Sequence, residues 1–550
     1  MKRNKEYMRR FFLLLSVCLY ASFLFAQSGA QVHDSSAKRS YVHMLHADAT
    51  RFDEKVNPDA WILVGNVRFR RDSMYMQCDS AHYFQKKNSF QAFGNVKMEQ
   101  GDTLFLYGDY ADFDGDSNMA RVRRGVQLIN RNVVLETDSL DFDRNTNLGY
   151  FFDYGTLSDE ESTLSSYYGE YNVGTKDALF LVGVSVENPQ FRIESDTLHY
   201  NTDSKMAAIA GPSNIYSGEN KVYSERALYN TAARQATLLD RSVLYNGNRN
   251  VTADSIYYDM QNGYSESFGN ILYLDSHDRN MLTGEYAYLN ELVDSAYVTG
   301  RALVCDFSQK DSLFMHADTI SVVSYNLNTD SLYRKVRACH KVRAWGESMQ
   351  AVCDSLVFDS RDSCMTMYKD PILWNGDIQL LGEVVKVYMD STSIDWVHII
   401  NQTLYAEPLD SMNFNQIKGK EMKFFFNEGK LSEMQVDGSV EIVFYPLDAD
   451  STYVGMNTTV AGRAVAYVKD GEVEKVVVPT DASGVFYPMG QRPPEKCFLE
   501  NFGWFDYVRP KSKQDLFQWR GKDANMKLKV FRRDAIPLPT LDRLKKKEDE

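Results

Sequence analysis

The stretch Met76-Gln77-Cys78-Asp79-Ser80-Ala81-His82-Tyr83 contains the pattern that decides the fold. Its order is apolar, any, small, acidic, any, apolar, any, aromatic, and it recurs at residues 251–258 and 351–358. With the acidic residue counted as position zero, the pattern occurs 14 times along the 550 residues. The commonest interval between successive zero positions is 29 residues. An internal period of this length indicates one repeat array rather than three or four independent domains. The zero positions are residues 48, 79, 109, 138, 167, 196, 225, 254, 285, 318, 354, 383, 420 and 463.

Two signatures recur in phase. The residue before zero is small in every copy, zero is acidic in 11 copies, and the residue at +4 is Phe or Tyr in 11. Between these stretches, Gly is followed by a polar and an aliphatic residue, as in Gly65-Asn66-Val67, Gly94-Asn95-Val96, Gly269-Asn270-Ile271 and Gly438-Ser439-Val440. We interpret the acidic residues as structural corners of the repeat. They include Asp48, Asp79, Asp109, Asp138, Asp196, Asp254, Asp318 and Asp354.

The apolar positions predict a bend at each acidic residue. Side chains alternate along a strand, so residues at −3 and −1 share one face, whereas those at +2 and +4 share the opposite one. A bulge at zero lets the chain cross to a facing sheet and keeps both halves inward. A small residue permits close backbone approach there, and Asp or Ser can satisfy the backbone N–H groups that the bend frees. The repeat therefore predicts an all-β, elongated, solenoid-like stack with two facing sheets.

Composition agrees with a β fold and limits the function classes. Tyr (34) and Phe (31) are abundant and Pro (13) is scarce, which suits pleated, half-buried surfaces. The net charge of −14 argues against nucleic-acid binding, which needs an excess of Lys and Arg over the acidic residues. Seven cysteines are too few for a disulfide-stapled scaffold.

Residues 1–26 have the pattern of a secretory signal peptide. Basic residues precede an apolar run at 11–25, and Ala26 places a small residue at the expected cleavage site. An uncleaved anchor is the alternative, but the run is shorter than the ~20 residues of a membrane span. We therefore expect cleavage near Ala26, a linker at 27–40 and a periplasmic protein, with outer-membrane association left open and membrane contact only peripheral.

The C-terminal segment 481–550 differs from the rest of the chain. Seven of the 13 prolines lie in the last 72 residues, and 13 Lys and Arg outnumber 8 Asp and Glu from Asp506 onward. Aromatic residues lie among these cations. We expect the segment to close the end of the repeat array, and docking to a partner or to an anionic membrane surface is the alternative. The aromatic residues are Phe502, Trp504, Phe505, Tyr507, Phe517 and Trp519.

No residue pattern indicates an enzyme. The Asp-Ser and Asp-Thr pairs look catalytic in isolation, but a site that returns in most repeats is structural, with O-glycosylation as the alternative. His43 and His46 lack the carboxylate spacing of a metal site, and no nucleophile elbow, phosphate loop or dinucleotide fingerprint occurs. We expect no catalytic residue, metal or cofactor. One disulfide among Cys339, Cys353 and Cys364 stays open as an alternative to free thiols.

The chain resembles the OstA/LptA family of periplasmic lipopolysaccharide-transport proteins. Ala47-Asp48-Ala49 with Gly65-Asn66-Val67, and residues 78–83 with Gly94-Asn95-Val96, carry the resemblance. It is best over residues 41–300, becomes more divergent over 301–480 and does not extend to 481–550. It implies an open β-jellyroll whose two sheets enclose an apolar groove, in which acyl chains of lipid A move between the inner and outer membranes. It also implies end-to-end β-strand pairing with other transport proteins.

These implications predict a lipid groove, with two alternatives open. The residues expected to line the groove could equally form a closed, dry core. A structural β-solenoid scaffold of the cell envelope that binds protein partners through its acidic face and aromatic tail is the alternative function. One continuous stack and two stacks divided near residues 300–350, where the repeat intervals lengthen, both fit the sequence. The predicted groove residues are Leu63, Val67, Phe69, Ala92, Val96 and Met98.

Overall fold

The computed structural model describes residues 40–520, apart from 53–54, 56–57, 309–311, 391–393, 428–429, 449–451, 470–471, 479–480 and 501. The predicted signal peptide, the linker up to residue 39 and the terminal residues 521–550 lie outside the described residues. The chain divides after Ala120 into two compact units, and β7 (Met119–Asn130) spans the division.

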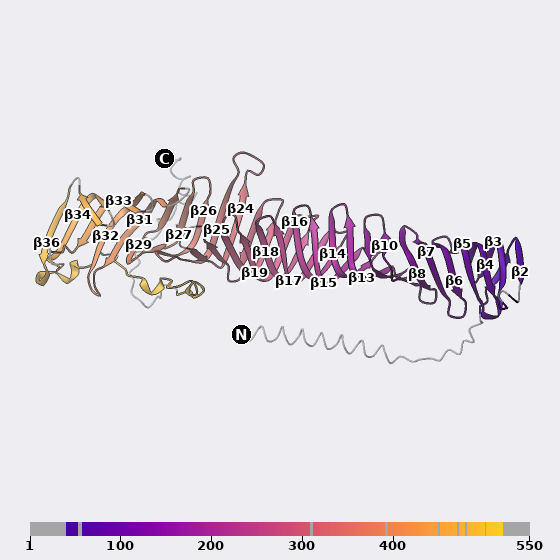
Figure 1. Cartoon of the computed structure of the whole chain (residues 1–550). Helices are drawn as coiled ribbons and strands as arrows, with labels where there is room; N and C mark the ends of the chain where they lie inside the picture. Colours follow the sequence, from indigo (N-terminus) through magenta and orange to yellow (C-terminus); the bar gives the residue numbers. More distant parts are fainter. Residues whose placement is uncertain are drawn as a thin grey trace, which may run out of the picture. The chain divides into compact units, whose positions relative to one another are not determined.

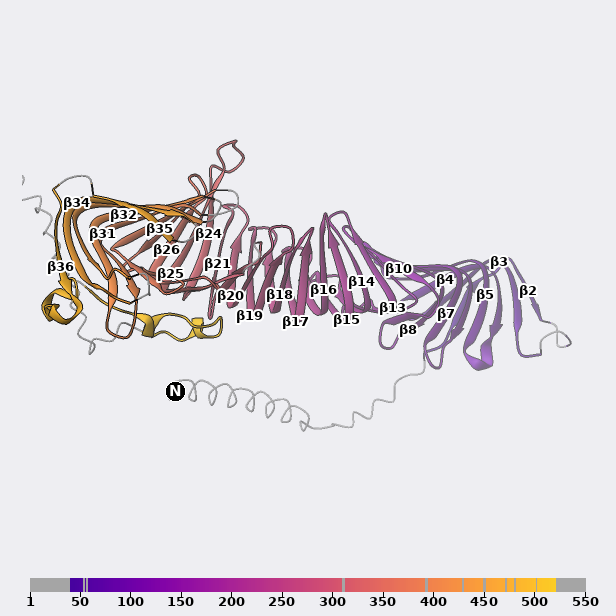
Figure 2. The same ribbon diagram turned by 60° about the vertical axis from the view of Figure 1, so that its left-hand side comes forward.

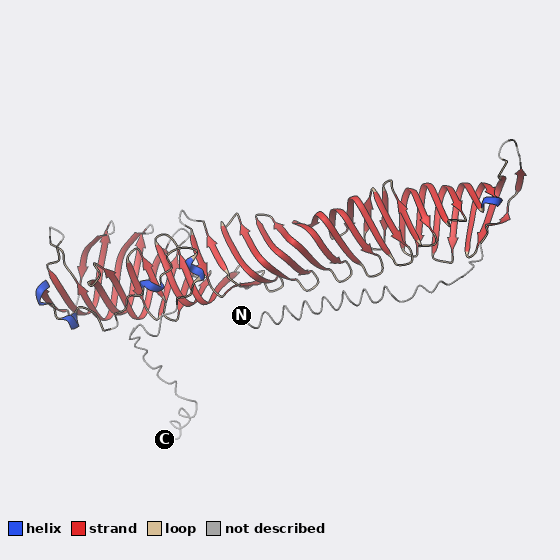
Figure 3. Ribbon diagram, turned by 90° about the horizontal axis from the view of Figure 1, so that it is seen from below, coloured by secondary structure: helices blue, strands red, loops and turns tan. Residues whose placement is uncertain are grey.

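The described residues are almost entirely β-strands, which confirms the predicted all-β class (Figure 3). Helical turns are short, and in this part of the chain none has the length and hydropathy to cross a membrane. The five 3-10 turns are η1 (Gln85–Lys87), η2 (Met489–Gln491), η3 (Pro494–Lys496), η4 (Asp506–Val508) and η5 (Asp515–Phe517).

In the first unit, strands pair antiparallel in chain order. β3 pairs with β4, β4 with β5 and β5 with β6, while the short strands β1 and β2 both pair with β3 on the two sides of a corner. The strands are β1 (His43–His46), β2 (Ala49–Phe52), β3 (Trp61–Arg71), β4 (Met74–Phe84), β5 (Ser89–Gln100) and β6 (Leu104–Asp114).

In the second unit, strands again pair antiparallel with their neighbours in the chain, and β13 to β20 follow one another along it (Figure 1). Some long strands are replaced by two short ones that meet at a corner, as β9 and β10 do. The strands up to β24 are β8 (Val133–Asp143), β9 (Leu148–Phe151), β10 (Gly155–Ser158), β11 (Thr163–Ser166), β12 (Tyr168–Asn172), β13 (Asp177–Asn188), β14 (Phe191–Asn201), β15 (Met206–Ser217), β16 (Asn220–Asn230), β17 (Gln235–Asn246), β18 (Arg249–Asp259), β19 (Tyr264–Asp275), β20 (Asn280–Asn290), β21 (Ser295–Thr299), β22 (Leu303–Asp306), β23 (Leu313–His316) and β24 (Thr319–Tyr325).

Pairing continues through residues 300–350 on both sides of the corner. β21 pairs with β24 and β24 with β25, while β22 pairs with β23 and β23 with β25. The second unit is therefore not interrupted where the repeat intervals lengthen. The remaining strands are β25 (Tyr333–Trp345), β26 (Met349–Asp359), β27 (Cys364–Tyr368), β28 (Ile372–Asn375), β29 (Ile378–Leu381), β30 (Val384–Met389), β31 (Ile394–Pro408), β32 (Phe414–Asn427), β33 (Lys430–Phe444), β34 (Gly455–Lys469), β35 (Glu472–Val477) and β36 (Ser483–Pro488).

β4 shows how a strand serves both sheets. The buried side chains Met76 and Cys78 precede Asp79, and the buried side chains Ala81 and Tyr83 follow it, so the inward parity changes at the acidic residue. The pairing register with β3 and with β5 shifts at the same point. A β-bulge therefore divides the strand into two arms that bend toward each other, as the sequence pattern predicted.

Two facing sheets result from these bends. Phe69 lies after the corner of β3 and Phe90 lies before the corner of β5, so they belong to opposite arms. β4 separates β3 from β5 within the sheet, yet the two rings stack with centroids 4.6 Å apart and planes 8° apart. The rings meet because the arms face each other across the interior.

The C-terminal segment lies on the outside of the second unit. We call residues 497–519 the strap, because they run back over the outer face of β25 to β34 (Figures 1 and 2, yellow). Phe505 and Val508 pack against Ile372 and Trp374. The sequence favoured a segment that closes the end of the array, and the structure instead uses its aromatic residues to cover a sheet face.

Three buried glutamines hold the strap, two of them by its backbone and one by the side chain of Arg509. Gln379 Oε1 accepts from Phe505 N at 2.7 Å, and its Nε2 donates to Gly503 O at 2.7 Å. Gln416 makes the equivalent pair of bonds with Leu499 N and Cys497 O, at 2.9 Å each. Gln350 Oε1 accepts from Arg509 Nε at 2.7 Å. Since these amides are buried, losing the strap would remove the hydrogen-bond donors to all three side-chain oxygens, which is costly.

Candidate functional site

The two repeat signatures meet at the corners. Asn95 follows Gly94 in the bulge of β5, and its Nδ2 donates to Asp79 Oδ2 at 2.8 Å. A Cβ on Gly94 would lie 2.5 Å from the same oxygen, and its φ is +73°. Glycine is therefore required there by both space and backbone conformation. The same amide–carboxylate bond joins Asn66 to Asp48 at 2.9 Å and Asn270 to Asp254 at 2.7 Å.

In later repeats, lysines from the bulge donate to the corner carboxylate. Lys341 Nζ donates to Asp318 Oδ2 at 3.0 Å, and Lys369 Nζ donates to Asp354 Oδ2 at 2.9 Å, which lowers the pKa of Asp354. The sequence suggested backbone donors for these carboxylates, and Gly125 N donating to Asp138 Oδ1 at 3.3 Å is such a case. At the other corners described above, asparagine or lysine side chains donate the hydrogen bond to the carboxylate. Asp109 and Asp196 occupy the corresponding positions on β6 and β14.

The small residue before zero stabilises the bulge. Ser224 Oγ donates to Arg226 O at 2.7 Å, and Cys78 Sγ makes the same bond to Ser80 O at 3.2 Å. All cysteines in the described residues are free thiols, so no disulfide joins Cys339, Cys353 and Cys364. Burial raises the pKa of the Cys78 thiol and of the Cys353 thiol to about 12, so neither is a reactive thiolate at neutral pH.

The last predicted corner is displaced by one residue. Asp437 pairs with Arg463 and Val440 with Ala461, so Gly462 lies opposite the bulge at Gly438 and Ser439. Gly462, and not Arg463, therefore occupies the zero position of the fourteenth repeat. The displacement explains why Arg463 departs from the acidic pattern.

Most of the bulges hold two successive residues with positive φ, even where no glycine is present, as at Asp240 and Arg241. Val182 is the unfavourable case, with φ +65° and a side chain that is 63% exposed. A β-branched residue in the left-handed region costs ~1–2 kcal/mol. We expect Val182→Gly to stabilise the second unit by about 0.5–1 kcal/mol in denaturant unfolding, because strain is relieved and little burial is lost. No stabilisation would show that this bulge is unstrained.

The six predicted groove residues all point inward in the first unit. Their side chains are between 0% and 4% exposed, so they pack closely between the two arms. The stacked rings of Phe69 and Phe90 occupy the space between them. Their contact with lipid stays a prediction. The residues are Leu63, Val67, Phe69, Ala92, Val96 and Met98.

In the second unit, one row of inward side chains crosses strand after strand. Each member lies directly opposite the next in the pairing register, as Leu244 lies between Val222 and Val251. We call this set the apolar row. Its members are Leu135, Leu157, Leu164, Val186, Ile193, Ile215, Val222, Leu244, Val251, Tyr273, Leu282, Val304, Met315, Ala344, Ala351, Leu373, Leu380, Tyr405, Ile417 and Ile442.

The exposure of the apolar row changes along the unit. Leu135 to Ile193 are buried, whereas from Ile215 to Ile442 the members are half-buried, apart from the buried Ala351 and Leu373. A narrow crevice lined by Ile193 and its neighbours, with about 10 Å³ of free volume, lies where the closed part ends. Solvent therefore reaches the inward apolar face beyond Ile193. No sequence signal found this change, because the inward residues are apolar in both parts.

The half-buried side chains of the apolar row are exposed toward the space between the sheets and not toward the outer face. Next to the half-buried Leu380 and Tyr405, the outward residues Gln379 and Leu404 are 0% and 1% exposed. The strap covers this outer face. The half-buried side chains are thus accessible from the space between the two sheets.

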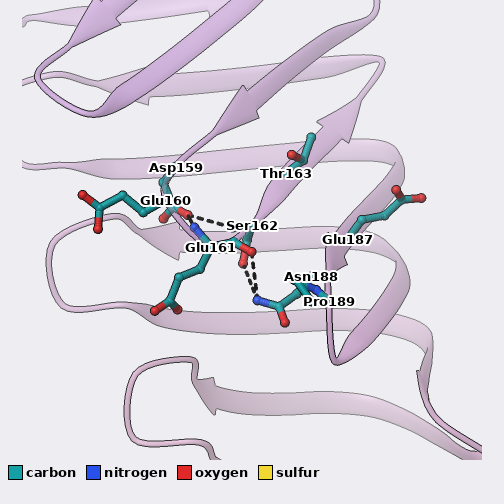
Figure 4. Close-up of a pocket in the computed structure, with 8 residues that line it drawn as sticks. All are labelled: Asp159, Glu160, Glu161, Ser162, Thr163, Glu187, Asn188 and Pro189. Carbon is teal, nitrogen blue, oxygen red and sulfur yellow. Dashed lines mark hydrogen bonds between the residues drawn. The ribbon is translucent and has the colours of Figure 1, made fainter.

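A second hollow of about 410 Å³ is acidic and lies at the surface (Figure 4). The carboxylates of Glu160, Glu161 and Glu187 point in different directions. Asp159 is already paired with Lys205 Nζ at 2.7 Å. In the part of the chain that is described, no group of three or more His, Cys, Asp or Glu could hold a metal ion. The exposed His46 instead pairs with Asp48 at 3.1 Å.

The fold and its corners define a repeat β-protein with two facing sheets and an apolar interior. Residues 39–196 match the family model described as OstA-like protein, and the chain is OstA-like over this part. Among solved structures, a match is LptH, the LptA-homologous periplasmic component of the lipopolysaccharide transport device from Pseudomonas aeruginosa. It has 17% identity and a TM-score of 0.19, and the match covers 22% of this chain and 82% of LptH. The search of curated proteins found no match.

Proposed function

We propose that this protein is a periplasmic lipid-binding protein that carries lipopolysaccharide, by its lipid A acyl chains, between the inner and outer membranes during outer-membrane assembly. The apolar row is the observation that carries the proposal. It presents a similar apolar surface on every strand, about 4.8 Å from the last, so an acyl chain meets the same environment at each step. The OstA-like match over residues 39–196 supports the same function.

The energetics suit such a cargo. Each CH₂ group moved out of water gains ~0.8 kcal/mol, so an acyl chain of about twelve carbons would gain on the order of 10 kcal/mol if it were fully covered. Covering the half-buried members of the row removes further apolar surface from water. The acidic residues lie at the outer corners, where Asp254 is exposed, so hydrocarbon and carboxylates occupy different surfaces. The net charge of −14 thus does not oppose acyl-chain binding in the interior.

The terminal strands suggest how partners attach. β1 and β2 pair only with β3, and β35 and β36 pair only with β34, among the described residues. Leu45 and Phe52 at one edge, and Val476 and Phe486 at the other, are exposed. Unpaired apolar edges are templates for strand addition. We propose end-to-end β-strand pairing with other transport proteins at these edges.

The proposal includes export and no catalysis. The predicted signal peptide would bring the chain to the periplasm, where the lipid passes between the membranes. The corner carboxylates are engaged with asparagine and lysine side chains, as in Asp79 and Asp354, which fits a structural role.

Purification of the full-length protein from envelope extracts, followed by mass spectrometry of the bound lipid, tests this function. We expect lipopolysaccharide to copurify with the protein. Recovery of partner proteins with no lipid would instead favour the envelope scaffold.

A further inference from the structure

We propose that β30 to β34 form a chamber, with methionines on its inward faces, that holds more acyl chains side by side than the narrower part formed by β13 to β20. The inference rests on the proposed lipid-binding function and adds that multi-chain lipids are preferred at this place.

The arms of the strands become longer in β31 to β34. β13 has five residues on either side of its bulge at Val182 and Gly183. β31 has seven residues before its bulge at Asn401 and Gln402 and six after it. At ~3.3 Å per residue, each arm gains roughly 3–7 Å. Hydrocarbon chains in contact lie about 4 Å apart, so the longer arms have room for about one more chain.

Methionines lie on the inward faces of β30 to β33. Met389 and Met434 are half-buried and pack against the interior cluster, and Met422 is buried within it. A methionine side chain is flexible and polarizable, so it adapts to hydrophobic partners of different shapes. The inward faces of β15 to β20 carry no methionine. They carry residues such as Val222 and Leu244, with serines near the corners.

Both arms are held in place around this chamber. The strap covers the outer face of one arm through Gln416 and through the packing of Leu499 with Leu404 and Val443. On the outer face of the other arm, the rings of Tyr388 and Trp396 stack with centroids 4.2 Å apart. Because both arms are braced from outside, their inward side chains can stay partly uncovered without collapse of the sheets.

Peroxide oxidation followed by mass spectrometry tests the location. The full-length protein is oxidised with and without hexa-acylated lipid A, and native mass spectrometry measures the bound lipid in parallel. We expect lipid A to slow oxidation of Met389 and Met434 at least fivefold. Met412, which is 70% exposed and lies outside the interior, is the internal control. Bound lipid with unchanged oxidation at the two methionines would overturn the chamber but not the proposed function. Absence of bound lipid would contradict the proposed function itself.

Narrowing the chamber tests the preference for several chains. Met434→Trp is expected to lower retention of hexa-acylated lipid A at least tenfold and to leave retention of a single-chain lysophospholipid within twofold. Met412→Trp, at the exposed turn before β32, should change neither. Equal losses of both lipids with Met434→Trp would overturn the preference. Circular dichroism and thermal unfolding verify that the variants fold, and the methionine oxidation of the unsubstituted protein keeps the location testable if they do not.

Discussion

Replacing Leu244 with Asp is expected to reduce the lipid that copurifies with the protein at least tenfold. Leu244 lies in the half-buried part of the apolar row, directly opposite Val222 and Val251. An ionised carboxylate beside an acyl chain is desolvated with no compensating partner, which costs several kcal/mol. Since 1.4 kcal/mol corresponds to a tenfold change in affinity, one charge is enough to interrupt the row. Quantitative mass spectrometry of extracted lipid per mole of protein provides the measurement.

The neighbouring residue supplies a matched control. Tyr245 is 41% exposed and points to the opposite side of β17. Tyr245→Asp introduces the same charge one residue away, on the outer face, and should leave lipid retention unchanged. Equal retention by both variants and the unsubstituted protein would show that lipid does not contact this part of the row.

Replacing Trp374 with Ala is expected to detach the strap from the second unit. Trp374 is 0% exposed and packs with Phe505 and Val508 between the sheet and the strap. Removing a buried aromatic side chain of this size costs ~3–5 kcal/mol. In a repeat array such a loss is local, because each element contacts only its neighbours. Amide hydrogen exchange within residues 497–519 should therefore accelerate by at least a hundredfold, while exchange in β13 to β20 stays unchanged.

An exposed tryptophan controls for the substitution itself. Trp61 is 41% exposed on β3, and Trp61→Ala should leave exchange in the strap unaffected. Unchanged exchange in the strap of Trp374→Ala would mean that the buried glutamines, and not the aromatic packing, hold it. Uniformly faster exchange throughout the second unit would mean that the strap stabilises the whole array.

The corners were predictable from sequence because their chemistry is local and repeated. Most corners combine a small residue, an acidic acceptor and a left-handed pair, so the same residue types return near every 29th position. The parity change at Asp79 alone required two facing sheets, and the stacked rings of Phe69 and Phe90 agree. The zero position of the fourteenth repeat was predicted one residue too late, at Arg463 instead of Gly462, because no acidic residue marks it there.

The strap and the opening could not be predicted from sequence for physical reasons. The strap bonds of Gln379 join residues 124 and 126 positions apart, and no periodic pattern encodes such contacts. The opening depends on how far apart the arms lie, whereas an inward Ile has the same sequence pattern in a packed core as in an open groove. Ile193 and Ile215 pair directly, yet the first is buried and the second half-buried.

Photo-crosslinking in cells tests the central claim most directly. A photoreactive amino acid placed at Leu244 or Val251, inside the apolar row, is irradiated while lipopolysaccharide is being delivered to the outer membrane. The lipid-carrier account predicts lipopolysaccharide adducts at both positions and none at Tyr245 on the outer face. Adducts to proteins alone at Leu244 and Val251, with no lipid at either, would contradict it.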